Sequence, residues 1–334
     1  MDDEKFMRAA LREARRGAGR TSPNPAVGAV VVRRGRVIAR GFHRCAGMPH
    51  AEIEAIAALK NPRRAREATI YVTLEPCSTH GRTPPCVDAI VRGRFARVVI
   101  GAIDPNPAHA GRGVELLRGA GIAVTTGVLE DECCELNVAF NKWIVTGMPF
   151  VIAKAALSLD GRLTRPPGES QWLTNAVSRA DAHRLRASVD AILVGAGTLR
   201  ADNPRLTVRG VGAARQPWRV VLAGRGRLPK DAHLFTDEHR ERTLIFRGKT
   251  LRTVLRELGR RQITSVLIEG GGAVLGDAFD RRLVDRVQFY LAPILCGGPH
   301  VIGGRGAAST AASLALKNPR YTRIGDDLRL TADV

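Results

Sequence analysis

The sequence has no long apolar run and few aromatic residues. No stretch approaches the roughly 18 apolar residues that a membrane-spanning helix needs, and the N-terminus, Met1-Asp2-Asp3-Glu4, is acidic where a signal peptide would be basic. We therefore expect a cytoplasmic protein without a membrane partner. Only 4% of the residues are aromatic, which leaves few rings on which a single-stranded nucleic acid could stack its bases.

Lysine is also scarce, although the formal net charge is +20. Only seven of the 52 basic residues are Lys, and the Arg residues are spread over every segment of the chain. A basic surface can attract nucleic acid, but so even a distribution favours a compositional origin. We expect no nucleic-acid partner, and phosphorylated metabolites would benefit from the same positive field.

Cysteine is too rare for a disulfide framework, since the chain has six in 334 residues, and we expect a reducing compartment. The proportions of hydrophobic and charged residues are those of a soluble globular protein, and the length allows two domains with full cores. The turn Thr146-Gly147-Met148-Pro149 resembles a boundary. We therefore expect one domain over 1–147 and a second over 148–334, packed closely and assembled into a homo-oligomer.

Both halves alternate strands with helices, which predicts an α/β fold throughout, and for the first half an α/β sandwich. In the first half we expect helices over 3–17, 51–59, 113–119 and 129–145, another beginning near residue 86, and strands over 27–32, 37–42, 69–74, 97–102 and 123–127. In the second half we expect strands over 150–157, 190–194, 219–223, 243–246, 264–269 and 285–291, then a hairpin of 320–324 with 328–331.

One imidazole and two thiols predict a metal site in the first half. His50, Cys77 and Cys86 would supply three ligands for a tetrahedral Zn²⁺ and leave a fourth position for water. Glu52, two residues after His50, can move the proton of that water, and H-x-E with P-C is typical of zinc deaminases, in which the Glu is not a ligand. The alternative is a core His with two buried thiols. Against it, each Cys follows a Pro and a predicted strand leads into the first.

The spacing of these ligands is unusual, because eight residues separate Cys77 from Cys86 where nucleobase deaminases usually have two. Together with the motifs around it, this spacing resembles the bifunctional deaminase-reductase family of bacterial riboflavin biosynthesis. The motifs of the first half are Thr21 to Gly28, His50-Ala51-Glu52, Thr73 to Cys77, Gly81 to Cys86 and Asp104 to Pro107. Those of the second half are Lys154, Ser158 to Gly161, Glu169 to Trp172, Ala201 to Pro204 and Ile268 to Gly271.

The resemblance implies an N-terminal cytidine-deaminase-like α/β/α sandwich and a C-terminal dihydrofolate-reductase-like α/β domain. It also implies two reactions on one phosphoribosylated pyrimidine. The first is zinc-dependent hydrolytic deamination of 2,5-diamino-6-(5-phosphoribosylamino)pyrimidin-4(3H)-one. The second is reduction of the ribosyl group by NADPH, which gives 5-amino-6-(5-phosphoribitylamino)uracil.

The resemblance also suggests which residues contact the ligands. In the deaminase, Asn24, His43, Gly81, Arg82, Asp104 and Asn106 would hold substrate, while Thr79 stands where the family commonly has His. In the reductase, Lys154, Ser170, Arg186, Leu206, Arg209 and Glu269 would border substrate. The cofactor would be bordered by Ala156, Trp172, Thr198, Asp202, Gly271, Gly272, Ala273, Val274, Leu275 and Gly276.

Residue chemistry alone leaves alternatives open in the second half. Gly195 to Thr198 and Gly270 to Gly272 each follow a predicted strand, where helix N-termini bind phosphate, but they also suit ordinary tight turns and lack the dinucleotide fingerprint. Glu269 could instead cap the following helix, and Arg186 or Arg209 could be surface residues. Rival functions are a nucleic-acid or nucleoside zinc deaminase with a ligand-binding appendage, and a reductase-like domain that only binds its ligand.

Overall fold

The computed structural model describes residues 2–79, 84–163 and 172–334. It divides into two compact units, Met1–Gly147 and Met148–Val334. In the described part of the chain, no helix combines the length and apolar character needed to cross a bilayer.

The first unit is built on a five-stranded sheet with the order β2-β1-β3-β4-β5. The pairs β1/β2 and β1/β3 are antiparallel, whereas β3/β4 and β4/β5 are parallel. Its strands are β1 (Gly28–Arg33), β2 (Arg36–Phe42), β3 (Thr69–Leu74), β4 (Arg97–Ala102) and β5 (Ala123–Thr125). Its helices are α1 (Asp3–Arg15), α2 (Ala51–Ala57), α3 (Cys86–Gly93), α4 (Arg112–Gly119), α5 (Glu130–Leu136) and α6 (Val138–Thr146), with a 3-10 turn over Pro62–Ala65.

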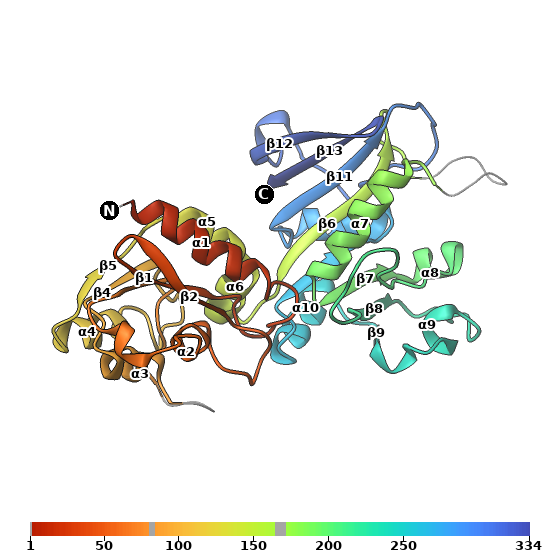
Figure 1. Cartoon of the computed structure of the whole chain (residues 1–334). Coiled ribbons are helices and arrows are strands. Elements are labelled where there is room, and N and C mark those ends of the chain that lie inside the picture. Colours follow the sequence, from red (N-terminus) through yellow and green to blue (C-terminus); the bar gives the residue numbers. More distant parts are fainter. Residues whose placement is uncertain (1, 80–83, 164–171) are drawn as a thin grey trace. The chain divides into compact units, whose positions relative to one another are not determined.

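Helices cover both faces of this sheet, which confirms the predicted sandwich. Alternate strand residues point to opposite faces: Ile70 packs with α2, α3 and α4, while its neighbour Tyr71 packs with α1 and α5. Figure 1 shows α1 lying across β1 and β2. The sequence therefore predicted the layers of the first unit correctly.

The single helix expected over 129–145 is wrong, because the chain forms α5 and α6 with a break at Asn137. Asn137 leaves the helical conformation, with φ −114° and ψ 19°. Its buried amide accepts a hydrogen bond from the Ala26 N–H at 2.8 Å and donates one to the Ala26 carbonyl at 3.0 Å. This pairing fixes the segment that carries Asn24 against the break between α5 and α6.

The second unit contains an eight-stranded sheet with the order β12-β13-β11-β6-β10-β7-β8-β9. The strands from β11 to β9 are parallel to their neighbours, and β13 and β12 are added antiparallel at one edge. The strands are β6 (Phe150–Ser158), β7 (Ala191–Gly195), β8 (Trp218–Ala223), β9 (Thr243–Arg247), β10 (Ser265–Ile268), β11 (Arg286–Ala292), β12 (Lys317–Ile324) and β13 (Asp327–Asp333). The helices are α7 (Ala176–Ser188), α8 (Ala196–Asp202), α9 (His233–Thr236), α10 (Leu251–Arg260) and α11 (Gly272–Asp280), with 3-10 turns over Arg240–Arg242 and Thr310–Ala312.

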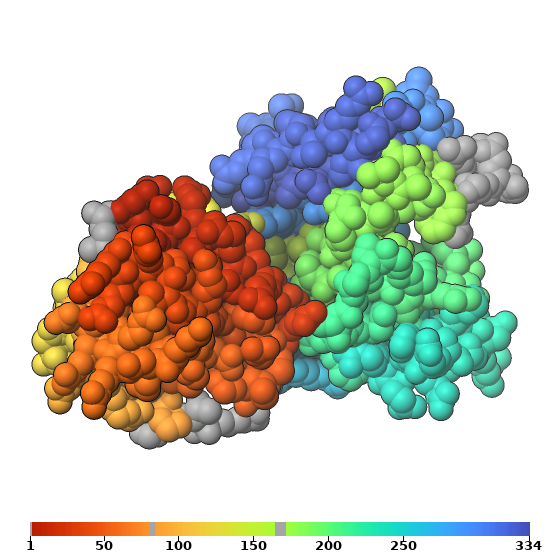
Figure 2. Space-filling view, in the orientation of Figure 1, coloured from red at the N-terminus to blue at the C-terminus, as the bar shows by residue number. Residues whose placement is uncertain are grey.

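Two apolar clusters cover the parallel part of this sheet. Leu193 of β7 belongs to the cluster that includes α10 and α11, whereas Ile192 belongs to the cluster that includes α8 and α9. The predicted strands and the closing hairpin are confirmed, with ends shifted by at most three residues. Seven of the eight residues of β12 are exposed, and Figure 2 shows this blue C-terminal segment on the surface of the second unit.

Candidate functional site

His50, Cys77 and Cys86 converge at the ends of three elements of the first unit. His50 is the N-cap of α2, Cys77 follows β3, and Cys86 is the first residue of α3. The His50 Nδ1 lies 3.5 Å from the Cys77 Sγ and 3.3 Å from the Cys86 Sγ. All three ligand atoms lie within 4.8 Å of one another. One imidazole and two thiols in this arrangement fit the donor set of a zinc site that keeps one open position.

The surroundings of Cys77 favour negative charge, whereas the hydrogen bond with Cys77 and burial raise the pKa of Cys86. The Cys86 N–H, at the start of α3, donates to the Cys77 Sγ at 3.3 Å, and a helix N-terminus stabilises a thiolate. The hydrogen bond with Cys86 lowers the pKa of Cys77 to about 4, against the opposing effect of burial. Metals bind the thiolate form of cysteine, and this form of Cys77 is favoured in the protein without a metal.

Glu52 lies beside this cluster and is buried in the first turn of α2. Burial, followed by the charge of Cys77, raises the pKa of Glu52 to about 7. A carboxyl group with such a pKa changes protonation state easily near neutral pH, as a general acid and base must. Its oxygens are not part of the three-residue ligand group.

Asn24 and His43 adjoin the metal ligands. The His43 Nδ1 lies 3.1 Å from the Pro49 carbonyl, which can only accept, so Nδ1 carries the hydrogen and Nε2 accepts from the Asn24 Nδ2 at 3.2 Å. The His43 ring meets the His50 ring edge-on, with centroids 5.3 Å apart. The structure thus brings two residues expected to hold substrate together with His50 of the candidate metal cluster.

Asp104 and Asn106 lie in one loop. Glu75, to which the sequence analysis gave no role, holds this loop in place. The Asn106 N–H donates to the Asp104 carboxylate at 2.9 Å. Buried Glu75 accepts hydrogen bonds from the N–H groups of Asp104 (3.2 Å), Gly111 (2.9 Å) and Val114 (3.1 Å). Glu75 thereby connects this loop to the segment that carries Cys77. Its position two residues before Cys77 was a signal that could have identified it.

Three further positions named from the sequence stand between Cys77 and Cys86. Gly81 and Arg82, both expected to hold substrate, lie outside the described residues. Thr79, at the position where the family commonly has His, is exposed.

Two of the cavities in the second unit, a larger one of about 440 Å³ and a smaller one of about 430 Å³, share part of their lining. Both lie where the parallel strands end, the edge at which α/β sheets bind ligands. The residues common to both cavities are Lys154, Ala156, Leu163, Thr198, Asp202 and Glu269. Two ligands bound in these cavities would therefore meet at the shared residues.

Glu269 forms a buried ion pair at this junction. Its carboxylate receives the Arg186 Nε at 2.6 Å and Nη2 at 2.7 Å, and the Lys154 Nζ lies 3.6 Å away. Although burial opposes it, the charges of Arg186 and Lys154 lower the pKa of Glu269 to about 2. Among the described residues, α11 is capped by Gly271 without a side-chain hydrogen bond. The Glu269 carboxylate is thus engaged by Arg186 and Lys154, which disfavours the alternative in which it caps this helix.

The smaller cavity is lined by the glycine turns noted in the sequence. Thr198 holds the second turn, because its Oγ1 accepts from the Gly271 N–H at 3.0 Å. Leu275 lies in the apolar core, and Gly276 packs so closely on the 300–304 segment that an added Cβ would lie 2.3 Å from the Gly303 carbonyl carbon. The expected cofactor residues that line this cavity are Ala156, Thr198, Asp202, Gly271, Gly272, Ala273 and Val274.

The larger cavity contains Trp172, Leu206 and Arg209, while Ser170 lies outside the described residues. Its lining includes His183, which the sequence analysis missed and whose Nδ1 accepts from the Arg209 N–H at 3.2 Å. Burial, followed by the charges of Arg186 and Arg209, lowers the pKa of His183 to about 4. His183 is therefore neutral near pH 7 and able to accept that hydrogen bond.

Comparison with known proteins gives matches over both units. A family model described as the cytidine and deoxycytidylate deaminase zinc-binding region matches residues 1–102, and one described as the RibD C-terminal domain matches residues 149–330. Together they support the expected deaminase-like and dihydrofolate-reductase-like folds.

Two curated proteins and one solved structure illustrate the similarity. The riboflavin biosynthesis protein RibD of Bacillus amyloliquefaciens is 41% identical over 99% of this chain and 96% of its own. That of Escherichia coli is 40% identical over 89% of each chain. The crystal structure of a diaminohydroxyphosphoribosylaminopyrimidine deaminase/5-amino-6-(5-phosphoribosylamino)uracil reductase from Thermotoga maritima superposes with a TM-score of 0.91 and 36% identity, covering 99% of this chain and 98% of the other.

Proposed function

Since the chain belongs to the family of bifunctional deaminase-reductases of riboflavin biosynthesis, we propose that its two units act in turn on one phosphoribosylated pyrimidine. Residues 1–147 remove an amino group from 2,5-diamino-6-(5-phosphoribosylamino)pyrimidin-4(3H)-one by hydrolysis. Residues 148–334 then reduce the ribosyl group with NADPH to give 5-amino-6-(5-phosphoribitylamino)uracil. The observation that carries this proposal is the pairing of a His, Cys, Cys cluster beside a buried Glu with a second unit whose two cavities meet at one ion pair.

In the deaminase, His50, Cys77 and Cys86 would hold a zinc ion, which supplies Lewis-acid activation of the attacking water. Glu52 takes one proton from that water and delivers it to a ring nitrogen, then takes a second proton from the hydroxyl of the resulting adduct and delivers it to the amino group, which departs as ammonia. Burial of Glu52 raises its pKa and favours the protonated form, which suits a group that accepts a proton from the attacking water. Water adds to the ring carbon, the carbon–nitrogen bond to the amino group breaks, and a carbonyl replaces that group.

Substrate binding in the deaminase is assigned to the loops around Glu52. Asn24, held by His43, and Asp104, which is fixed by Glu75 and followed by Asn106, offer amide and carboxylate groups suited to the polar edge of a pyrimidine. Gly81 and Arg82, in the sequence between the two cysteines, complete the proposed set.

In the reductase, the smaller cavity suits a dinucleotide and the larger one suits the pyrimidine ribotide. The main chain at Gly271 to Ala273 opens α11, and its N-cap Gly271 brings no side chain to the helix end, which leaves room for a phosphate group. Trp172 lines the neighbouring larger cavity and is proposed to border the same cofactor. NADPH bound there would supply the hydride.

The residues of the larger cavity orient the sugar. Lys154 and Arg186, both held by Glu269, can donate hydrogen bonds to ribose oxygens at the junction of the cavities. Leu206 and Arg209 form another wall of the larger cavity, and Ser170 belongs to the proposed substrate set. Because the sugar carbon that accepts the hydride must face the cofactor, the shared residues are where this transfer takes place.

The order of the two reactions provides a test with Glu52→Gln. This variant should oxidise NADPH at the wild-type rate when given the deaminated ribotide and should fail to oxidise it when given the diaminopyrimidine ribotide. Wild-type protein should oxidise NADPH with either compound. The proposal fails if wild-type protein oxidises NADPH with neither, or if the Glu52→Gln variant accepts both compounds equally.

A further inference from the structure

Arg219 is a charged side chain buried within the second unit. It lies in β8, is 1% exposed, and forms an ion pair with Asp237 through an Nη1–Oδ2 contact of 2.6 Å. Its Nε donates to the Thr243 Oγ1 at 3.1 Å and its Nη2 to the Leu234 carbonyl at 3.0 Å. Nη1 also donates to the Arg205 carbonyl at 3.3 Å. One guanidinium group thus joins three separate segments of the chain.

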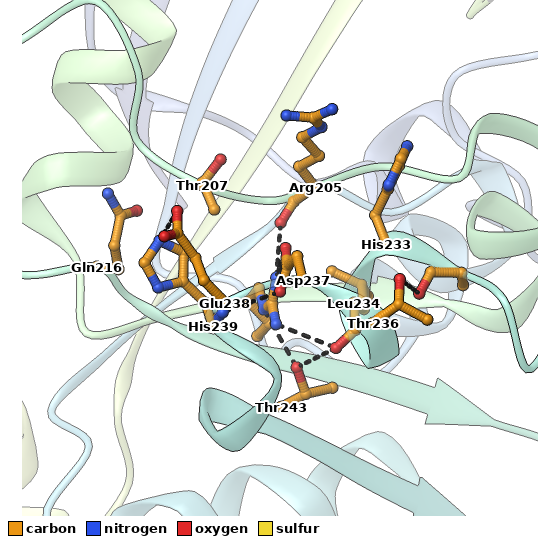
Figure 3. Close-up of polar contacts among 12 residues, drawn as sticks. Arg205, Thr207, Gln216, His233, Leu234, Thr236, Asp237, Glu238, His239 and Thr243 are labelled. Carbon is orange, nitrogen blue, oxygen red and sulfur yellow. Dashed lines mark hydrogen bonds and ion pairs between the residues drawn. The ribbon is translucent and has the colours of Figure 1, made fainter.

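Two of these segments form walls of the larger cavity. The segment 203–209 lines it with five residues, and His233, which begins α9, lines it from the other segment. Figure 3 shows Arg205, Leu234, Asp237 and Thr243 gathered around the hydrogen bonds of this network. In the same view the side chains of Arg205 and His233 extend away from the network. Arg219 therefore binds the backbone of the two wall segments, at the Arg205 and Leu234 carbonyls, and leaves the side chains of Arg205 and His233 free to point away from it.

The segment 203–209 needs such support because its backbone is strained. Leu206 has a φ angle of 50°, in a region that costs non-glycine residues about 1 kcal/mol or more and persists only when the surroundings enforce it. Asn203, with φ 40°, is the left-handed C-cap of α8, a conformation that Asn adopts readily. The Arg205 carbonyl, which Arg219 binds, immediately precedes Leu206. The Asn203 side chain accepts from the His233 N–H at 2.9 Å, so the two walls are also joined directly.

Fold stability alone is a weak reason for such an arrangement. Burying an ion pair often contributes no more to stability than well-packed apolar residues would, because both charges lose their hydration. What the guanidinium provides instead is geometry, since it donates to carbonyls of two segments at once in fixed directions. These hydrogen bonds therefore fix the shape of the cavity wall.

We propose that Arg219 is a positioning residue of the reductase, which sets the affinity for the pyrimidine ribotide by fixing the backbone at Arg205 and Leu206. It acts through that wall and does not touch the substrate. The inference rests on the proposed function, because it takes the larger cavity as the site of the ribotide. The smaller cavity contains no residue of 203–209, and its glycine turns follow strands other than the one that carries Arg219, so cofactor affinity is independent of Arg219.

The test is steady-state reduction by the full-length Arg219→Lys variant. Lysine keeps the charge beside Asp237 but cannot reach Arg205, Leu234 and Thr243 together. We expect the KM for the deaminated ribotide to rise about tenfold, while kcat and the KM for NADPH change less than about twofold. Deamination by the same sample should be unchanged and reports on the amount of folded protein.

Arg286→Lys is the matched control, because Arg286 also forms an ion pair within the sheet, at 2.7 Å from Asp333, and lines neither cavity. It should lower stability to some extent without a selective rise in the ribotide KM. If Arg219→Lys is insoluble, Asp237→Asn replaces it, and its ribotide KM should rise about threefold with the KM for NADPH unchanged.

An unchanged ribotide KM in the variant tested would overturn the proposal, and so would equal rises in the KM of ribotide and NADPH. A selective rise in Arg286→Lys as large as that in Arg219→Lys would also overturn it. If wild-type protein does not oxidise NADPH with the ribotide, the proposed function itself fails, which is a separate result.

Discussion

Replacing Glu269 by Gln removes the charge at the junction of the two cavities while keeping the size of the side chain. Arg186, whose side chain is 14% exposed, then loses the carboxylate that binds two of its nitrogens, and Lys154 loses its neighbouring charge. Breaking a buried ion pair from one side is destabilising because the remaining charge is left uncompensated. We therefore expect the second unit to become less stable.

The size of the effect follows from the pKa of Glu269, which is about 2 in the folded protein against an ordinary value of 4.5. That difference corresponds to about 3 kcal/mol of stability at neutral pH. For a unit of this size, each kcal/mol lowers the melting temperature by about 2–4 °C, so the expected fall is about 6–12 °C. Because the pKa is lowered on folding, this contribution is complete above the unfolded-state pKa of 4.5 and is lost as the pH falls from there toward 2.

Differential scanning calorimetry of the full-length protein measures this effect. The transition of the second unit should move in Glu269→Gln at pH 7, while that of the first unit stays in place. The difference between variant and wild type should shrink as the pH is lowered from 5 toward about 3. Glu257→Gln is the control, since Glu257 contacts Lys249 and Arg261 on the surface of the same unit and should change little.

An unshifted transition at pH 7, or a shift that is as large at pH 3 as at pH 7, would refute the ion-pair reasoning. Reduction of the deaminated ribotide should also fall at least about tenfold in this variant, a loss of about 1.4 kcal/mol in transition-state stabilisation, with deamination intact. Normal reduction by a destabilised variant would leave Glu269 with a structural role alone.

Three further predictions concern the first unit. Cys77→Ser should lose most of its bound zinc, as measured by metal analysis. Glu52→Gln should keep the metal and lose deamination activity by at least the roughly 10²–10⁴-fold that general acid–base catalysis contributes. Full zinc retention in Cys77→Ser, or near-normal turnover in Glu52→Gln, would contradict these roles. A fragment of residues 1–147 should be soluble and deaminate without NADPH, and activity only in the presence of the remainder would count against an autonomous unit. Asn137→Ala should lower the free energy of unfolding by about 2 kcal/mol, because it leaves the Ala26 N–H and carbonyl without their partner, and equal denaturation midpoints for variant and wild type would show that this pairing is dispensable.

The sequence predicted the metal cluster because its chemistry is local. His50 and Glu52 share the first turn of one helix, and Cys77 and Cys86 adjoin a strand end and a helix start. Apolar runs and helical spacing likewise predicted the strands of both units and most helices of the first.

What the sequence could not provide are contacts between residues far apart in the chain. The break at Asn137 depends on Ala26, which lies 111 positions away, and an apolar pattern that continues across the break gives no sign of it. The role of Glu75 depends on N–H groups that pack against it only after folding. Arg219 stands in a strand of a chain rich in Arg, so only its burial distinguishes it from the others.

The central claim is that one chain carries out hydrolytic deamination and then reduction of the same ribotide. Mass spectrometry of the products from zinc-loaded, full-length protein and the diaminopyrimidine ribotide tests it most directly. Without NADPH the product should gain about 1 Da, because an oxygen function replaces the amino group, and with NADPH it should gain about 2 Da more through hydride and proton addition. An unchanged mass in both samples, or the same single gain with and without NADPH, would contradict the account.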